Sequence, residues 1–312
     1  MYRIAFLMII LGAALWGTIG LFVQGLYDLG FSPIEVVTIR VTVAFVALML
    51  YVLIKNKDAL IIKWRHLPFF LGTGICSIVF FNWAYFTAIQ EMNLSIAAVL
   101  LYTGPAFVTI LSRIFFKELF TPQKMVALFT TFLGCILVIQ LFPLNTANLS
   151  LYGILVGLGS GFGYALYSIF GKVALSSYSS LTTTTYTFLV ATVALLPTSG
   201  LAGKGMAPWN MDALWISLGL GVIPTVFAYL LYTRGLHQVE SSKASIASTI
   251  EPVVATLIGV FIFQDILTTF QFLGIIFILS GVMFINMGGR RILKKKKVTF
   301  EGNSVTNHRS TG

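Results

Sequence analysis

Charged residues are scarce in this chain, because only 10% of its 312 residues are Asp, Glu, Lys or Arg. A soluble domain needs far more charge to cover its surface, so this scarcity excludes an ordinary soluble protein. Hydrophobic residues make up 57% of the sequence, and the mean hydropathy is +0.92. This composition is typical of an integral membrane protein.

Residues that bind metals or nucleotides are also few. The two cysteines, Cys76 and Cys135, lie in apolar stretches and the three histidines are scattered, so we expect no disulfide, no metal site and no cofactor. The sequence has no P-loop, so ATP-driven transport by this chain alone is not expected. It has no paired His or Asp cluster in an apolar stretch, and we predict that it is not an enzyme.

Long apolar segments cover most of the chain. A helix of about 20 residues crosses a bilayer with its backbone groups satisfied, whereas barrel strands are about half as long and alternate in polarity. The sequence therefore predicts an all-α integral membrane protein. We expect ten transmembrane helices, at residues 4–24, 33–54, 67–89, 94–116, 125–144, 151–175, 181–197, 214–235, 244–263 and 270–287.

The basic residues fall on one side of this predicted topology. If the N-terminus is cytoplasmic, the outside connections hold only Lys204. The sequence therefore predicts a multi-pass protein of the plasma (bacterial inner) membrane with both termini in the cytoplasm. The basic residues of the inside connections are Lys55, Lys57, Lys63, Arg65, Arg113, Lys117, Lys124, Lys172, Arg234 and Lys243.

Much of the net charge of +10 lies in one tail, residues 290–312, which begins with Arg290 and Arg291 and continues into four lysines. We interpret this tail as a disordered cytoplasmic anchor with affinity for anionic lipid. No basic folded domain presents the charge, so we expect no nucleic-acid partner.

The chain contains an internal repeat. At an offset of 147 residues, 80–140 aligns with 227–287, so that Ser95 meets Ser242 and Glu118 meets Asp265. Each half then holds five helices, and an odd number makes the two halves cross the membrane in opposite directions. We predict two inverted repeats, residues 1–144 and 145–289, around a central cavity. Inverted repeats are typical of carriers that work by alternating access.

Two ionisable residues lie within predicted helices, where charge is costly. Glu251 would bind a substrate ammonium or titrate to couple protons; alternatively, it is a structural partner for Arg40 or for backbone freed by Pro252. We interpret Arg40 as part of a helix-packing or gating ion pair. Pro105 and Pro252 align in the repeat, and kinks there would be either a hinge or ordinary packing irregularity.

Aromatic and polar residues from several predicted helices are candidates to line the cavity. A tyrosine offers an apolar face and a hydroxyl, which suits small amphipathic ligands and cations. An interfacial belt or ordinary core packing is the alternative. With Glu251, the candidates are Trp16, Asn82, Tyr85, Tyr102, Tyr164, Tyr167, Tyr229 and Tyr232.

Two stretches at equivalent places carry a family resemblance: Glu251-Pro252-Val253 through Gln264-Asp265 to Gly281, and Gly104-Pro105 through Lys117-Glu118 to Gly134. With Trp16-Gly17 and Arg40, they resemble the EamA-type domain of the drug/metabolite transporter superfamily over about residues 5 to 288. The sequence departs from that pattern with Gly104 opposite Glu251, and with Asp265 where Glu is usual.

The resemblance implies two inverted five-helix repeats, a central cavity, and export or exchange of amino acids, their derivatives, other metabolites or drugs. It also implies that Trp16, Asn82, Tyr85, Tyr102, Tyr164, Tyr232 and Glu251 line the cavity. We therefore expect a secondary transporter for an amino acid or a related amphipathic compound or drug. Its expected partners are this substrate, the lipid bilayer and protons, and it would be a monomer or weak dimer. The alternative is a passive facilitator or channel on the same fold.

Overall fold

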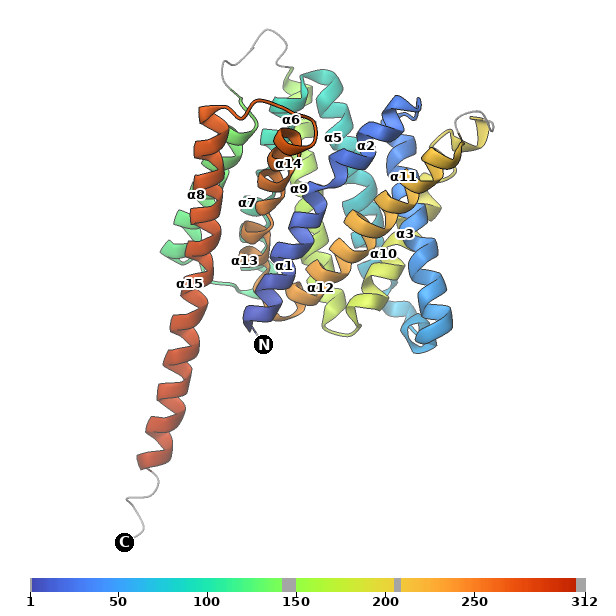
Figure 1. Cartoon of the computed structure of the whole chain (residues 1–312). Coiled ribbons are helices and arrows are strands. Elements are labelled where there is room, and N and C mark those ends of the chain that lie inside the picture. The colour runs from blue at the N-terminus through green and yellow to red at the C-terminus, as the bar shows by residue number, and fades with distance from the viewer. Residues whose placement is uncertain (1, 142–149, 205–208, 307–312) are drawn as a thin grey trace.

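The computed structural model describes residues 2–141, 150–204 and 209–306, and these residues form helices joined by short connections (Figure 1). Eight helical segments among them are long and apolar enough to cross a membrane. They are Tyr2–Asp28, Pro33–Lys55, Trp64–Glu91, Leu94–Phe116, Leu151–Leu175, Met211–Gln238, Ser241–Phe261 and Thr269–Met287. Two shorter apolar helices, Pro122–Val138 and Ser180–Leu195, occupy the remaining two predicted segments. The predicted domain boundary between residues 144 and 145 lies outside the described residues.

Several of these segments are made of more than one element. In the first half, the elements are α1 (Tyr2–Gly17), α2 (Ile19–Asp28), α3 (Pro33–Lys55), η1 (Lys57–Leu60), η2 (Trp64–His66), α4 (Leu67–Leu71), η3 (Gly72–Val79), α5 (Phe80–Glu91), α6 (Leu94–Leu101), α7 (Gly104–Phe116) and α8 (Pro122–Val138). In the second half, they are α9 (Leu151–Leu175), α10 (Ser180–Leu195), η5 (Leu201–Gly203), α11 (Met211–Gly221), η6 (Val222–Phe227), α12 (Ala228–Gln238), α13 (Ser241–Ala247), α14 (Ile250–Phe261) and α15 (Thr269–Thr306).

Polar residues at the helix starts satisfy backbone N–H groups that have no partner inside the helix. The side chains of Asn93, Thr121, Ser150, Ser179 and Asn210 each accept a hydrogen bond from a backbone N–H three residues later. These caps fix where the apolar segments begin.

Both halves interrupt their fourth apolar segment near a proline. Tyr102 and Thr103 separate α6 from α7, and Ser248 and Thr249 separate α13 from α14. Proline has no N–H to donate and clashes with the preceding helical turn, so a break before Pro105 and Pro252 is the expected local structure.

Other local features recur at the repeat offset. The hydroxyl of Thr109 donates to the carbonyl of Pro105 (2.7 Å), and that of Thr256 donates to the carbonyl of Pro252 (2.8 Å). Each half also carries one π-helical segment in its third apolar segment, η3 and η6. The two halves therefore share details of backbone hydrogen bonding as well as sequence.

The helices form one bundle. Figure 1 shows α8 and α15 side by side along one flank, with α3, α10 and α11 gathered on the opposite flank and α1, α9 and α12 between them. Glycines allow the closest approach: a Cβ on Gly134 of α8 would lie 2.8 Å from the carbonyl oxygen of Gly274 in α15, and a Cβ on Gly274 would lie 2.7 Å from that of Gly134.

The first described helix begins, and the last one ends, on the same side of the bundle (Figure 1). The basic tail was expected to be disordered from residue 290, but α15 continues as helix to Thr306. An apolar helix precedes the tail, and Lys, Arg and Leu favour helix, so extension of α15 is physically reasonable. Residues 307–312 lie outside the described chain.

Candidate functional site

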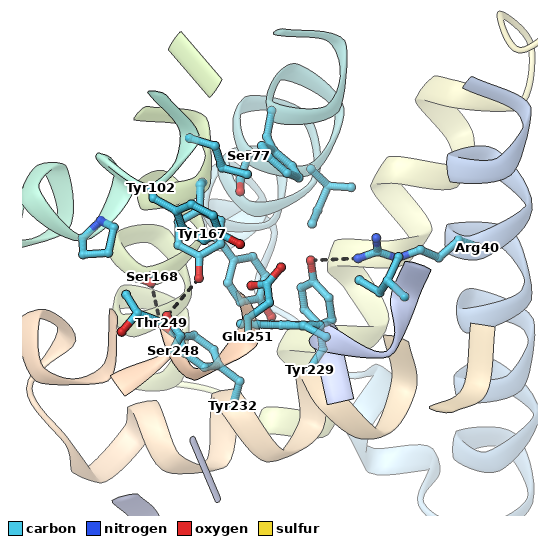
Figure 2. Close-up of a pocket in the computed structure, with 17 residues that line it drawn as sticks. Arg40, Ser77, Tyr102, Tyr167, Ser168, Tyr229, Tyr232, Ser248, Thr249 and Glu251 are labelled. Carbon is cyan, nitrogen blue, oxygen red and sulfur yellow. Dashed lines mark hydrogen bonds between the residues drawn. The ribbon is translucent and has the colours of Figure 1, made fainter. Parts of the chain in front are cut away.

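A pocket that both halves of the described chain line lies where the helix breaks face α1, α9 and α12. It has a cavity volume of about 80 Å³ and is partly open to the exterior. Figure 2 shows the side chains that surround it. They are Trp16, Ile19, Arg40, Ser77, Ile78, Phe81, Leu101, Tyr102, Pro105, Tyr164, Tyr167, Ser168, Tyr229, Tyr232, Ser248, Thr249 and Glu251.

Four packed aromatic residues form one wall of this pocket. The ring of Trp16 lies 5.1 Å from that of Tyr229 and 4.9 Å from that of Tyr232, and the ring of Tyr167 lies 5.0 Å from that of Tyr229. Edge-to-face contacts of this kind add to the stabilisation that burial provides. The indole N–H of Trp16 is buried and has no hydrogen-bond partner among the described residues, so it is an available donor.

Hydroxyl groups hold the tyrosines in place. The Tyr164 hydroxyl lies 2.9 Å from the Ser248 hydroxyl, and the Ser168 hydroxyl lies 2.8 Å from that of Tyr232. Ser248 belongs to the break between α13 and α14, so this break contributes polar atoms directly to the pocket (Figure 2). The wall therefore combines apolar rings with fixed hydroxyl groups.

Two opposite charges face the pocket without pairing. The guanidinium of Arg40 donates to the hydroxyls of Thr225 (3.1 Å) and Tyr229 (3.4 Å). The Glu251 carboxylate forms no hydrogen bond or ion pair with any residue in the described part of the chain. An ion pair between Arg40 and Glu251, one of the alternatives for Glu251, is therefore not formed among the described residues. Figure 2 shows the reason, because Tyr229 lies between the two groups and takes a hydrogen bond from Arg40.

The equivalent position in the first half has no room for a carboxylate. Gly104 aligns with Glu251, and a Cβ there would lie 2.8 Å from the ring of Tyr164. The Tyr164 ring occupies the space that a side chain at position 104 would need. Packing thus accounts for the presence of this carboxylate in only one half.

The two halves of the chain also match one family model separately. The EamA-like transporter family matches residues 3–140 and again residues 151–287. The chain belongs to the EamA-like transporter family. The two matches meet at the pocket, because residues from both line it.

Relatives of this EamA-like chain agree with the assignment. It is 31% identical to an "uncharacterized transporter" of Archaeoglobus fulgidus over 277 residues, which are 88% of this chain and 93% of the relative. It is 26% identical to the "uncharacterized transporter YwfM" of Bacillus subtilis, over 91% of this chain and 94% of that protein. A crystal structure with 16% sequence identity superposes with a TM-score of 0.77 over 92% of this chain and 98% of the other, which shows a shared fold.

Family membership and the apolar helices together make this EamA-like chain a multi-pass membrane transporter. Most of the residues predicted for its cavity lie around the pocket. Those are Trp16, Tyr102, Tyr164, Tyr167, Tyr229, Tyr232 and Glu251, with Arg40 and Pro105 from the predicted gating set.

Three predicted residues of the EamA-like chain do not line the pocket. Asn82 is buried, and its side-chain amide donates to the carbonyl of Ile78 (2.7 Å), so it serves the irregular backbone of its own helix. The ring of Tyr85 stacks on that of Phe81 at 6.0 Å, about one turn beyond the lining. Pro252 is buried in the first turn of α14, and it is not among the residues that line the pocket.

Sequence reasoning missed several lining hydroxyls, namely Ser77, Ser168, Ser248 and Thr249. The sequence contains one pattern that could have pointed to Ser248. Ser242, Ser245 and Ser248 recur every three residues in an apolar segment, which places hydroxyls along one face of a helix.

Proposed function

We propose that this chain is a secondary transporter that exports or exchanges a small amphipathic metabolite, an amino acid or related compound or drug, by alternating access. The observation that carries the proposal is the pocket between the two halves, where Glu251 and Arg40 face the same space without pairing. Charges within the membrane that lack an oppositely charged partner are costly, and a ligand that carries the opposite charges would offset that cost.

The chemistry of the wall suits a zwitterion with an apolar side chain. Glu251 and the surrounding aromatic faces would bind an ammonium group. The guanidinium of Arg40 has five N–H donors and uses two of its nitrogens on hydroxyls, which leaves donors for a carboxylate. The rings of Trp16 and Tyr102 would pack against the rest of the molecule. Protons are a further proposed partner, taken up by Glu251 when no ammonium is bound.

The proposed topology has ten transmembrane helices in two inverted repeats, with both termini in the cytoplasm of a bacterial inner membrane. Three observations support it: the repeated proline breaks, the repeated π-helical segments, and the placement of the first and last helix ends on one side (Figure 1). The positive charges of the connections favour the cytoplasm for that side. We further propose that the protein works as a monomer or weak dimer and binds no nucleic acid.

Flux measurements test this function. Purified protein in liposomes should take up labelled amino acids or amphipathic amines with saturation, and excess unlabelled substrate should compete. Flux that rises linearly with concentration, or single-channel conductance, would assign the chain to the passive facilitators or channels. Absence of substrate-dependent flux across a broad panel of metabolites would contradict the proposal.

A further inference from the structure

A carboxylate of the first half binds the second half at one end of the bundle. Glu118 follows α7, and its carboxylate accepts hydrogen bonds from the backbone N–H groups of Ser241 (2.7 Å) and Ser242 (3.2 Å). It also accepts one from the Ser242 hydroxyl. Charge-assisted bonds are among the stronger ones in proteins. The contact joins the connection between α7 and α8 to the start of α13.

Three further charges surround this contact. The Lys124 ammonium lies 3.3 Å from a Glu118 oxygen and 3.1 Å from a Glu240 oxygen, and Lys243 lies 2.8 Å from the same Glu240 oxygen. Lys124 is only 2% exposed, so it needs these carboxylates as partners. Burial by itself would raise the pKa of Glu240, but the two ammonium groups outweigh burial and hold that pKa below its ordinary value. We call Glu118, Lys124, Glu240, Ser242 and Lys243 the latch.

The opposite end of the bundle repeats the turn that carries the carboxylate. Lys117 and Gln264 both have positive φ, of 56° and 62°, immediately before Glu118 and Asp265. The N–H of Glu118 donates to Ser112 (3.2 Å) and that of Asp265 donates to Gly259 (3.0 Å), which is the same bond at the repeat offset. Asp265 is therefore presented in the same way as Glu118.

The repeated turn makes no equivalent contact. Asp265 is exposed, and its carboxylate forms no hydrogen bond or ion pair with the residues that the structure describes. Ser95, the counterpart of Ser242, donates instead to the carbonyl of Ile139 in its own half (3.4 Å). Gln271 stands where Lys124 stands in the first half, so the far end also lacks the buried ammonium.

The difference between the two ends is local. On the flank formed by α3 and α10, the halves are joined at both ends. Lys204 lies 2.6 Å from Glu35 at one end, and the Tyr186 hydroxyl donates to the carbonyl of Leu60 (2.7 Å) at the other. Glu35 lies in the first turn of α3 and Leu60 in η1, which follows α3, so the two contacts lie at opposite ends of that helix. Among the described residues, the carboxylate contact on α6/α7 and α13/α14 is therefore formed at one end and not at the other.

We infer that the latch is a gate that keeps the pocket closed on the side where α1 begins and α15 ends, and that Asp265 with the start of α6 forms the counterpart gate when the latch opens. The inference rests on the proposed function, which places the latch in the cytoplasm. Because the counterpart lacks a buried lysine, it binds less firmly. The resting protein therefore favours the state that is open to the outside.

The test measures access to the pocket from each side of the membrane. A reporter thiol, Leu101→Cys, is placed in the lining of a protein in which Cys76 and Cys135 are replaced. A membrane-impermeant maleimide is then added to right-side-out or inside-out vesicles. With the latch intact, labelling should be fast from outside and slow from the cytoplasmic side. Glu118→Gln should raise the cytoplasmic rate about tenfold, the shift expected from losing one charge-assisted bond, and lower the outside rate.

Matched variants separate gating from damage. Asp265→Asn neutralises the counterpart, which makes no contact in this state, so cytoplasmic labelling should stay slow and outside labelling should stay fast or increase. Ser242→Ala removes one hydroxyl and should act like a milder Glu118→Gln, which provides a second variant if the first does not fold. Equal labelling of Glu118→Gln, Ser242→Ala and the parent from both sides would overturn the latch. The readout needs no substrate, so a shift in labelling without any flux would contradict the proposed function and leave the latch intact.

Discussion

At the scale of the residue, Glu251 and Gly104 show how one repeat can have two chemistries. The same turn of the same helix carries a carboxylate in one half and no side chain in the other. The ring of Tyr164 explains the glycine, since a Cβ at position 104 would lie 2.8 Å from it. The repeat therefore places residues 104 and 251 at equivalent positions, and the Tyr164 ring leaves no space for a side chain at position 104.

Neutralising Glu251 should weaken substrate binding without unfolding the protein. Glu251→Gln keeps the shape but removes the charge that we assign to the substrate ammonium, so affinity should fall about 10- to 100-fold, as expected for a hydrogen bond to a charged group. Titration of purified protein with a labelled substrate measures this. Asp58→Asn, an exposed site outside the pocket, should bind like the wild type. An equal loss in both variants would argue against a direct role for Glu251.

Filling the space at Gly104 should displace the Tyr164 ring. In Gly104→Ala the added Cβ forces that ring away and breaks its hydrogen bond to Ser248, at a cost of about 1–3 kcal/mol. Thermal unfolding in detergent should show a lower midpoint, and substrate affinity should fall. Gly20→Ala is the matched control, because nothing lies within 4 Å of a Cβ there. A Gly104→Ala protein as stable as Gly20→Ala would show that the ring can move freely.

Acid should weaken the latch through Glu240. Its pKa is lowered in the folded protein, so its contribution to stability is present above the ordinary value of 4.5 and is lost as pH falls through the lower folded value. The thermal midpoint of the wild type should therefore drop on acidification below about pH 4.5. In Glu240→Gln this drop should be smaller. Parallel pH profiles for the two proteins would show that other carboxylates control acid sensitivity.

At the scale of the element, the broken segments are the notable feature. Hydropathy predicted their spans to within a few residues, since a bilayer requires an apolar stretch of fixed length. It did not predict that 94–116 and 244–263 would each divide into two helices, or that η3 and η6 would be π-helical. An apolar side chain is equally compatible with an α-helical and a π-helical backbone. Hydropathy therefore does not predict which carbonyl each backbone N–H bonds to.

The proline breaks should control the rate of the conformational change. In Pro252→Ala an additional backbone N–H can extend α14 toward α13 and stiffen the break, so exchange should slow several-fold while substrate affinity stays within about twofold. Exchange rates in liposomes and equilibrium binding measure the two quantities. Pro33→Ala is the control, because proline at the first position of α3 removes no helical bond. Normal exchange in Pro252→Ala would contradict a hinge at this break.

Some of the pocket residues could be predicted from the sequence and others could not. Tyrosines were candidates because each offers an apolar face and a hydroxyl, and seven of the candidate residues surround the pocket. Asn82 was misplaced because its amide serves a carbonyl of its own helix. A pair between Arg40 and Glu251 was one alternative, but the intervening Tyr229 depends on helix rotation, which neither composition nor spacing reveals.

At the scale of the whole molecule, the most informative difference between the two repeats is at the turns that carry Glu118 and Asp265. The two turns before Glu118 and Asp265 share a positive φ and an equivalent backbone bond, yet among the described residues only the carboxylate of the first turn bonds to the other half. An alignment of the halves predicts that both carboxylates can make the contact. It cannot predict which one does so at a given moment, because that choice depends on the relative position of the two halves.

We propose that the pocket opens to one side of the membrane at a time and so carries a substrate across it. Counterflow in liposomes tests it most directly: vesicles loaded with an unlabelled amino acid or amphipathic amine are diluted into a trace of the same labelled compound. We expect a transient accumulation of label above its equilibrium level, strongly reduced in Glu251→Gln and retained in Asp58→Asn. Label that enters only to equilibrium, at a rate independent of the internal substrate, would contradict alternating access.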